Sequence, residues 1–236
     1  MDIDLPAILF WAVLACAAVW LLDIVFFKSK RLAADPDAED PTPVEYAKSF
    51  FPVLLLVLLL RSFLAEPYQI PSESMVPTLE VGDFILVNKY AYGLRLPVFG
   101  TKVLSIGDPQ PGDVMVFIPP HDPRYFIKRV IGLPGDFLEV RQQKVYINEE
   151  LIWEKHAWHT DMPQQSRLVP RDDFGPIVVP PGHLFMMGDN RENSQDSRFW
   201  GFLEINKIKG KALVIYWSWN AEDSWVRFDR FGQILR

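Results

Sequence analysis

The distribution of hydrophobic residues divides the chain into two parts. Two long apolar runs lie near its beginning, and short apolar runs separated by turn residues follow from about residue 66. The first long run, AILFWAVLACAAVWLLDIVFF at 7–27, contains one charged residue, Asp23. A helix of about this length, rising 1.5 Å per residue, crosses a hydrocarbon core of roughly 30 Å. We therefore predict a transmembrane helix at 7–27.

The second apolar run, FFPVLLLVLLLRSFLA at 50–65, is shorter and contains Arg61. An arginine near the end of a membrane helix can extend its guanidinium toward the lipid headgroups, so we predict a second transmembrane helix at about 48–65. A helix buried in a soluble core is the alternative for this run. For the first run the alternative is a cleaved signal peptide, which usually begins with basic residues, whereas this chain begins with the acidic stretch MDIDLP.

Basic residues are concentrated between the two runs. Lys28, Lys30 and Arg31 follow the first run, Lys48 precedes the second, and neither Lys nor Arg precedes the first. Cytoplasmic loops carry an excess of Lys and Arg, so we predict that 28–47 is a cytoplasmic loop and that both termini lie outside. The Pro-rich, acidic composition of this loop is typical of a solvated linker.

Residues 66–236 have the pattern of a β domain, whereas 1–65 form the membrane anchor. Three Gly-Asp pairs each precede a run rich in β-branched and aromatic residues, in GDFILV, GDVMVFI and GDFLEV. Gly and Asp favour turns, and such runs favour strands. We predict a hairpin closed near Gln142 and Gln143, no long helix, and a mainly antiparallel β domain outside the membrane that is long enough to bury its own core.

Composition and charge narrow the range of functions. The formal net charge of the 236 residues is -6, so the chain lacks the basic surface that binds a phosphate backbone, and nucleic acid is not an expected partner. The single cysteine, Cys16, excludes an internal disulfide and a cysteine zinc site. No histidine belongs to an HExxH motif and no serine to GxSxG, so we expect neither a metal nor a cofactor. Surface positions are the simplest interpretation of the histidines, His121, His156, His159 and His183.

The stretch PSESMVPTL at 71–79 places serines between prolines without a histidine base. A neutral lysine can take the proton instead, and Lys128 in YFIKRVIGLPGD is the candidate. The two-residue period of a strand places Lys128 on one face with Phe126 and Val130. Burial among apolar residues disfavours the ammonium, so the pKa of Lys128 should fall from about 10.4 toward the working pH. An ordinary strand lysine at a sheet edge is the alternative.

A third polar stretch, MGDNRENSQDSRFWG at 187–201, precedes an aromatic pair. Such a density of polar residues usually marks a solvated loop. It can also form a network that holds a catalytic group, because an Asp and an Arg two positions apart can pair and a serine hydroxyl can bond an amine.

These stretches together resemble the bacterial type I signal (leader) peptidases. The resemblance rests on PSESMVPTL, GDFILVNKYAYG, YFIKRVIGLPGD and GDNRENSQDSRFWG, in this order after two apolar segments, and it covers nearly the whole chain. It implies a multi-pass protein of the bacterial inner membrane whose all-β catalytic domain faces the periplasm. It also implies a membrane-bound serine endopeptidase that removes N-terminal signal peptides from exported proteins after Ala-x-Ala-type sites. The precursors' signal peptides and the lipid bilayer would be its partners.

The resemblance also implies roles for individual residues. Ser74 would be the nucleophile and Lys128 its neutral general base. Ser72 would donate its hydroxyl to the oxyanion together with the backbone N–H of Ser74, and Ser194 would orient the Lys128 amine.

Supporting residues and substrate pockets follow from the same resemblance. Asp196 and Arg198 match the family's supporting salt bridge. The residues expected around two shallow substrate pockets are Tyr68, Ile70, Met75, Leu79, Ile85, Val116 and Ile127. The chain departs from the family at Glu73, where Gly is common, and it has a short accessory subdomain at about 137–180.

Two other functions compete with the peptidase. An anchored β domain with a degenerate site would bind exported chains without cutting them, but the presence of Ser74, Lys128 and Ser194 favours the enzyme. A self-cleaving repressor also uses Ser/Lys chemistry, but it would need a DNA-binding segment, and the acidic charge argues against one. Near the end of the chain, Trp217, Trp219 and Trp225 either pack in the core or lie at the level of the lipid headgroups.

Overall fold

The computed structural model describes residues 5–36, 38–63, 66–95, 102–152, 155–159, 172–221 and 223–235. The chain forms two compact units. One consists of Met1–Ala65 with Gly93–Ser105, and the other of Glu66–Tyr92 with Ile106–Arg236. The structure thus groups Gly93–Ser105 with the first unit, although the sequence assigned this segment to the outer domain.

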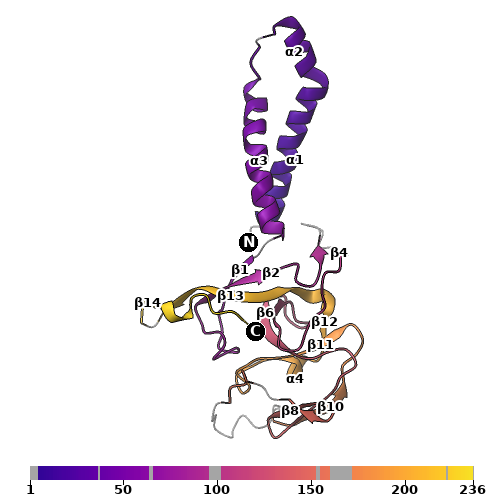
Figure 1. Ribbon diagram of the computed structural model, residues 1–236, viewed down its shortest axis with the longest axis vertical. Helices are drawn as coiled ribbons and strands as arrows, with labels where there is room; N and C mark the ends of the chain where they lie inside the picture. Colours follow the sequence, from indigo (N-terminus) through magenta and orange to yellow (C-terminus); the bar gives the residue numbers. More distant parts are fainter. Residues whose placement is uncertain are drawn as a thin grey trace. The chain divides into compact units, whose positions relative to one another are not determined.

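The first unit contains a pair of long helices (Figure 1). α1 (Leu5–Leu22), the π-helical turn η1 (Asp23–Phe27) and α2 (Lys28–Ala34) follow one another directly, and α3 (Thr42–Phe63) packs along α1. The spans Ala7–Ala34 and Thr42–Leu59 are long and apolar enough to cross a membrane, and few of their side chains are buried. The second apolar run is therefore not a helix buried in a soluble core. β3 (Leu94–Arg95) and β4 (Lys102–Leu104) form a short ribbon in this unit.

The helices extend into the segment that the sequence assigned to a loop. The prediction placed the loop at 28–47, but the first helical stretch continues to Ala34 and α3 begins at Thr42. Only 35–41 connects them. Proline suits the first turn of a helix because its missing N–H would have no partner there, and Pro43 occupies this position in α3.

Ion pairs connect the ends of these helices with the segment between them. Arg31 donates to Asp23 at 2.7 Å and to Asp40 at 2.6 Å, and Lys48 also contacts Asp40. Charges that the sequence assigned to a solvated linker are instead paired across the connection between α2 and α3.

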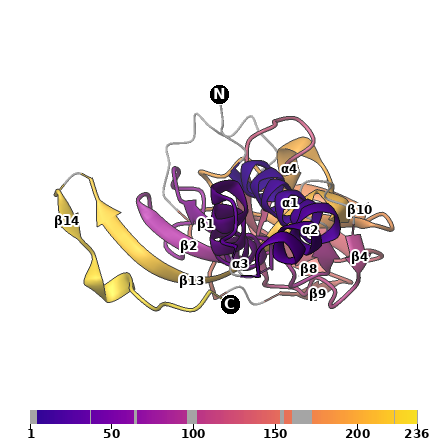
Figure 2. The same ribbon diagram turned by 90° about the horizontal axis from the view of Figure 1, so that it is seen from above.

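The second unit is built around a large antiparallel sheet with the strand order β1-β2-β13-β5-β6-β11-β12, to which β14 adds by pairing with β13. Its strands are β1 (Glu66–Gln69), β2 (Asp83–Asn88), β5 (Val114–Phe117), β6 (Phe126–Gly132), β11 (His183–Met187), β12 (Leu203–Glu204), β13 (Ile208–Asn220) and β14 (Trp225–Val226). Figure 2 shows the long, curved β13 leading to β14. The described helical segments of this unit are short: α4 (Ser197–Trp200), η3 (Ile205–Lys207) and η4 (Phe228–Arg230). The predicted fold class, mainly β and antiparallel, is confirmed.

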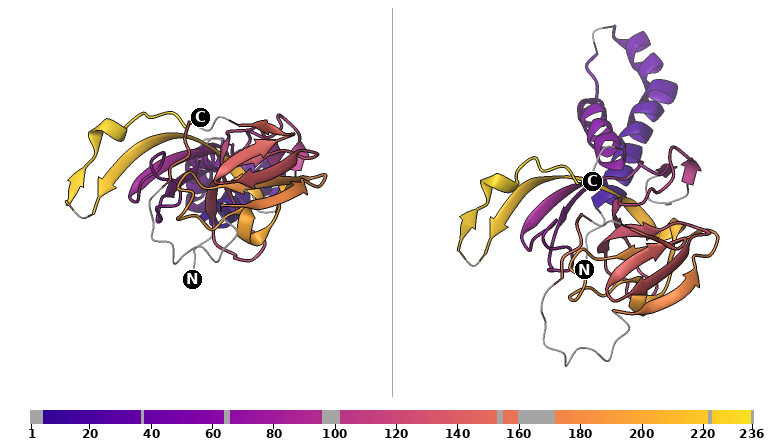
Figure 3. Two further views of the ribbon diagram at one scale, coloured as in Figure 1. Left: turned by 90° about the horizontal axis from the view of Figure 1, so that it is seen from below. Right: turned by 60° about the horizontal axis from the view of Figure 1, so that its bottom comes forward.

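A smaller sheet has the strand order β10-β7-β8-β9 (Figure 3). Its strands are β7 (Phe137–Arg141), β8 (Lys144–Ile147), β9 (Glu150–Leu151) and β10 (Phe174–Val178). The predicted hairpin is confirmed, since β7 and β8 are joined by Gln142 and Gln143, which have φ of 49° and 66°. Both central residues of a type I′ turn need positive φ. The sheet occupies the segment predicted to form a short accessory subdomain.

The three Gly-Asp pairs form the same turn before β2, β5 and β7, and the strands predicted after them are confirmed. Asp83, Asp113 and Asp136 each accept a hydrogen bond from the backbone N–H three residues earlier, at 2.8, 3.0 and 2.8 Å. The preceding glycines have φ of 89°, 90° and 93°, a conformation that costs little only for glycine. These turns set where each strand begins.

Candidate active site

Ser74 lies in the loop 71–82, which connects two neighbouring strands of the large sheet. The backbone closes the base of this loop, because Ile70 N donates to Asp83 O at 2.8 Å. Within the loop the Met75 side chain is fully buried and anchors the chain directly after the serine. A backbone hydrogen bond at the base of the loop and the buried Met75 side chain therefore both restrict the position of Ser74.

Lys128 lies in the middle of β6, which pairs with β5 on one side and β11 on the other. It is 3% exposed. Its Nζ donates to Ser74 Oγ at 2.6 Å and to Ile127 O at 2.9 Å. The alternative of a strand lysine at a sheet edge is therefore wrong.

Burial changes the chemistry of the Lys128 amine. Loss of solvation lowers the pKa of Lys128 to about 8, although the negative charges of Asp196 and Asp189 act in the opposite direction. The ammonium is destabilised because the surrounding protein solvates it less well than water does. With this pKa, roughly a tenth of the amine is neutral at pH 7 and about half is neutral at pH 8, and the neutral form can accept a proton.

The hydroxyl of Ser72 lies next to that of Ser74. The two oxygens are 3.4 Å apart. Ser72 is exposed, whereas Ser74 is 8% exposed. One hydroxyl thus faces solvent and the other faces the lysine, so a group entering from solvent at Ser74 would meet both.

Ser194 is buried near these residues without a hydrogen bond to Lys128. Its Oγ is enclosed and makes no hydrogen bond of good geometry among the described residues, although the hydroxyl is close enough to Asp196 to help lower the pKa of that carboxyl. It lies against Gly188, where a Cβ would be 2.3 Å from Ser194 Oγ and 2.4 Å from Ser74 O. The sequence analysis missed the importance of Gly188. The signal available in the sequence was a glycine directly after an apolar strand, because glycine at such a position often marks the close approach of another backbone.

Asp196 and Arg198 form a buried, two-pronged ion pair. Arg198 Nε and Nη2 donate to Oδ1 and Oδ2 of Asp196, each at 2.8 Å. Burial alone would raise the pKa of Asp196, but the hydrogen bond and charge of Arg198 outweigh burial and lower it. Asp196 also accepts from Gly188 N at 3.1 Å. The stretch 187–201 is therefore a largely buried polar network, and its interpretation as a solvated loop is wrong.

A second buried ion pair, which the sequence analysis missed, joins Arg129 to Asp189. Arg129 Nε and Nη2 donate to the two carboxylate oxygens at 2.8 and 2.7 Å. Arg129 Nη1 also donates to Gly112 O at 2.7 Å, and Thr78 Oγ1 donates to Asp189 at 2.6 Å. Strand alternation indicated that Arg129 faces away from Lys128, but the sequence did not reveal its partner.

The seven residues expected around the substrate pockets belong to one apolar cluster. Six are buried members and Tyr68 packs against them. The members are Ile70, Met75, Leu79, Ile85, Val116 and Ile127, together with Val87, Val114, Ala212, Ile215 and Leu235. Met75, which directly follows Ser74, and Ile127, which directly precedes Lys128, therefore belong to one apolar cluster.

The histidines lie in other environments. His121 stacks on Trp200, with ring centroids 6.0 Å apart, and His159 Nδ1 lies 2.8 Å from Glu192 Oε1. Burial lowers the pKa of the half-buried His156. Within the described ranges, no group of three or more His, Cys, Asp or Glu side chains could hold a metal ion.

Comparisons with known proteins agree on one family. Residues 43–217 match the family described as signal peptidase, peptidase S26. Proteins named signal peptidase I from Pseudomonas aeruginosa and Pseudomonas fluorescens are each 45% identical to this chain, over 93% of the chain and 94% of each relative. A crystal structure of a signal peptidase I from Enterococcus faecalis covers 45% of this chain and 98% of its own, at 32% identity and a TM-score of 0.36.

Proposed function

The chain belongs to the signal peptidase family, serine peptidases that remove signal peptides from exported proteins, and we propose that it does so with Ser74 and Lys128. In this proposal Ser74 is the nucleophile and Lys128 is the general base. The observation that carries it is the 2.6 Å separation between Lys128 Nζ and Ser74 Oγ at a buried site. A serine hydroxyl is a weak nucleophile until a neighbouring base takes its proton.

The proposed reaction proceeds through an acyl-enzyme. Neutral Lys128 accepts the Ser74 proton while Oγ attacks the scissile carbonyl carbon, and the carbonyl oxygen becomes an oxyanion. The Ser72 hydroxyl and the Ser74 backbone N–H donate to that oxygen. The ammonium then gives its proton to the departing amine as the C–N bond breaks. A water molecule, deprotonated by Lys128, attacks the ester carbonyl, and Lys128 returns that proton to Ser74 Oγ as the C–O bond breaks, which releases the signal peptide and restores both residues.

The buried polar residues around Lys128 support the dyad. In the proposal Ser194 orients the amine, and the Asp196–Arg198 pair fixes the backbone near Gly188. Ser194 is buried, and its Oγ makes no hydrogen bond of good geometry among the described residues, so the hydroxyl retains bonding capacity for the amine during turnover.

The apolar cluster beside Ser74 and Lys128 supports a preference for substrates with small residues at the cleavage site. A shallow apolar pocket accepts a methyl group and excludes larger side chains by overlap. Cleavage after Ala-x-Ala should therefore tolerate Gly or Ser at the last position and fail with Leu or Phe. Of the seven residues predicted for the two pockets, Tyr68 and Ile127 have the most surface open to a substrate, whereas Met75, Leu79 and Ile85 are fully buried and can only support the pocket walls from behind.

The two helices of the first unit support anchoring in the bacterial inner membrane. Their length and composition permit two spans. The basic residues at 28–31 favour a cytoplasmic connection, which would put the catalytic domain on the periplasmic side. Protease added to spheroplasts should then degrade the domain after residue 66, and protection of that domain would contradict this orientation.

The deciding experiment incubates the full chain in detergent with a precursor whose leader ends in Ala-x-Ala. We expect a mature protein whose N-terminus, read by mass spectrometry, begins directly after that site. Ser74→Ala and Lys128→Ala should give no product. Binding without cleavage would instead support the anchored binding module.

A further inference from the structure

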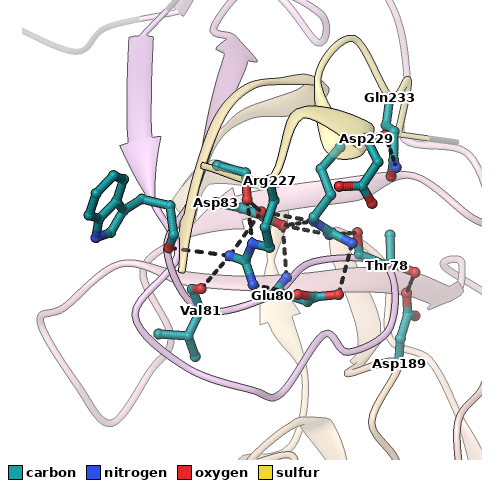
Figure 4. Close-up of polar contacts among 11 residues, drawn as sticks. Thr78, Glu80, Val81, Asp83, Asp189, Arg227, Asp229 and Gln233 are labelled. Atoms are coloured by element: carbon teal, nitrogen blue, oxygen red, sulfur yellow. Dashed lines mark hydrogen bonds and ion pairs between the residues drawn. The ribbon is translucent and has the colours of Figure 1, made fainter. Parts of the chain in front are cut away.

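Two arginines near the end of the chain bind the segment that follows Ser74 (Figure 4). Arg230 Nε and Nη2 contact the carboxylate of Asp83 at 3.0 and 2.6 Å, and its Nη1 contacts Glu80 at 3.0 Å. Arg227 Nη1 contacts Glu80 at 2.5 Å. A segment far away in the sequence therefore holds the end of the loop 71–82.

The Arg230 contact is enclosed by protein. Asp83 has no exposed surface and Arg230 is 7% exposed. Ser218 Oγ also donates to Asp83 at 2.6 Å. A planar guanidinium that donates to fixed oxygens sets both distance and direction, which a single-point ammonium cannot do. The contact therefore constrains the geometry of the loop.

Thr78 connects Arg230 to the buried residues beside the dyad. Arg230 Nη2 donates to Thr78 O at 3.1 Å, and the Thr78 hydroxyl donates to Asp189 at 2.6 Å. Asp189 in turn binds Arg129, the neighbour of Lys128. Thr78 is thus held through its carbonyl on one side and through its hydroxyl on the other.

We infer that Arg230 is a positioning residue for the proposed peptidase reaction, which it serves by fixing Thr78 and, through it, the loop that holds Ser74 against Lys128. The inference rests on the proposed function. Loss of the Arg230 guanidinium would leave Thr78 O without this donor and allow the loop 71–82 to shift. Ser74 Oγ would then leave its 2.6 Å contact with Nζ, and water would reach the amine.

The test compares Arg230→Lys with Arg227→Lys in the full chain in detergent micelles. Lysine at 230 keeps the charge beside Asp83 but has one terminal nitrogen, so it cannot reproduce the contacts that Nε, Nη1 and Nη2 together make with Asp83, Glu80 and Thr78 O. Arg227 binds Glu80, Ser218 and Val81 O and lies 3.5 Å from Asp83, but among the described residues it makes no contact with Thr78, so its replacement is the control for losing contacts to the same acidic residues alone. Thr78→Val removes the hydroxyl end of the same connection and should reproduce the effect of Arg230→Lys.

Two measurements distinguish positioning from general destabilisation. The first is the pH dependence of kcat/KM on a leader peptide, and the second is a titration of Lys128 by NMR with carbon-labelled lysine. The charged groups that act on Lys128 are Asp196 and Asp189, each paired with an arginine. The two arginine variants leave the contacts of both carboxylates unchanged, so a shift of the Lys128 midpoint in them reports hydration of the amine. Thr78→Val also removes a hydrogen bond to Asp189, so this variant is compared through kcat.

We expect Arg230→Lys to lower kcat by about tenfold with little change in KM, and to raise the Lys128 midpoint by about half a pH unit or more. Arg227→Lys should shift the midpoint less. An unchanged midpoint in Arg230→Lys would overturn the inference even if the melting temperature falls, because a purely structural role predicts that result. A wild-type chain that cleaves no leader would overturn the proposed function, whereas the NMR titration would still decide whether Arg230 controls the environment of Lys128.

Discussion

At the scale of single residues, the environment of Lys128 combines two opposing influences. Burial destabilises its ammonium, whereas the nearby carboxylates stabilise it, and burial dominates. Each carboxylate is already neutralised by its own arginine, through the Asp189–Arg129 and Asp196–Arg198 pairs. The lysine is therefore surrounded by paired charges, which leave its amine available as a base.

The pH dependence of cleavage should follow the protonation of Lys128. Its pKa lies at about 8 in the folded protein, and only the neutral amine can accept the Ser74 proton. We therefore expect kcat/KM to be low below this value and to rise as the pH increases through it. The measurement is the initial rate on a leader peptide across the pH range. A rate that falls as the pH rises through 8 would contradict the assignment.

Lys128→Arg tests the lysine as a base rather than as a charge. The guanidinium keeps the positive charge but does not deprotonate in this range, so we expect cleavage to fall to the level of Lys128→Ala. Circular dichroism would check that the variant remains folded. Cleavage near the wild-type rate would exclude the dyad.

Glu73 should influence which precursors are cut efficiently. It is exposed, its carboxylate accepts from Asn193 Nδ2 at 3.1 Å, and the described residues provide it with no ion pair. A substrate charge near the cleaved bond would interact with it by less than about 1 kcal/mol across solvent. Glu73→Gln should therefore improve cleavage of precursors with Asp beside the site, by a few-fold relative to those with Lys.

Asn193→Ala is the control for that comparison. It removes the hydrogen bond to Glu73 but leaves the charge, so the preference for Lys over Asp should persist. Equal effects of Glu73→Gln on both precursors would show that Glu73 acts through loop structure and not through its charge.

At the scale of elements, the Gly-Asp turns determine where the strands begin, and the first of them also closes the loop of Ser74. Gly82 and Gly112 have nearly the same φ, 89° and 90°. They differ in their surroundings, because a Cβ at Gly82 would lie 2.0 Å from Trp219 O whereas Gly112 has nothing within 4 Å. One turn is therefore packed against β13 and the other is open.

This pair of glycines gives a matched test of the packing. Gly112→Ala should cost about 1 kcal/mol, the strain of a side chain at positive φ. Gly82→Ala should cost more, since the backbones of the turn and of β13 must also separate. Thermal melting of the two variants in detergent measures the difference in stability. Equal melting temperatures would show that the turn at Gly82 can move away from β13 without loss of stability.

At the scale of the whole molecule, the β domain displays aromatic side chains at the end of its long strand. Trp217, Trp219 and Trp225 are 40%, 40% and 67% exposed, so their interpretation as core residues is wrong. Phe228 nearby is 64% exposed. Tryptophan favours the interface between lipid and water, so the exposed cluster supports contact with the headgroups.

We expect a chain that begins at Glu66 to bind phospholipid vesicles, and replacement of the three tryptophans by serine to weaken this binding at least several-fold. Sedimentation with vesicles measures it. The serine variant should melt at nearly the wild-type temperature, because exposed side chains contribute little to the free energy of unfolding. Undiminished binding by the serine variant would place the membrane contact elsewhere.

The sequence alone determined the features that depend on neighbouring residues. Apolar length indicated the helices, Gly-Asp pairs and alternation gave the strands, and two polar residues between apolar runs gave the hairpin at Gln142 and Gln143. Such signals are local because helix and strand periods and turn conformations are properties of short segments. The order of the motifs also indicated Ser74 and Lys128 as partners, through resemblance to a family.

The tertiary structure decided what depends on contacts between distant segments. It paired Arg129 with Asp189 and Arg230 with Asp83, and it brought Gly188 against Ser74. It also showed that the helices extend into the predicted loop, where Arg31 and Lys48 pair with Asp40. A sequence shows which groups are charged or small, but a partner 60 or 147 positions away is set by how the strands of the sheet are ordered, and local pattern does not contain that order.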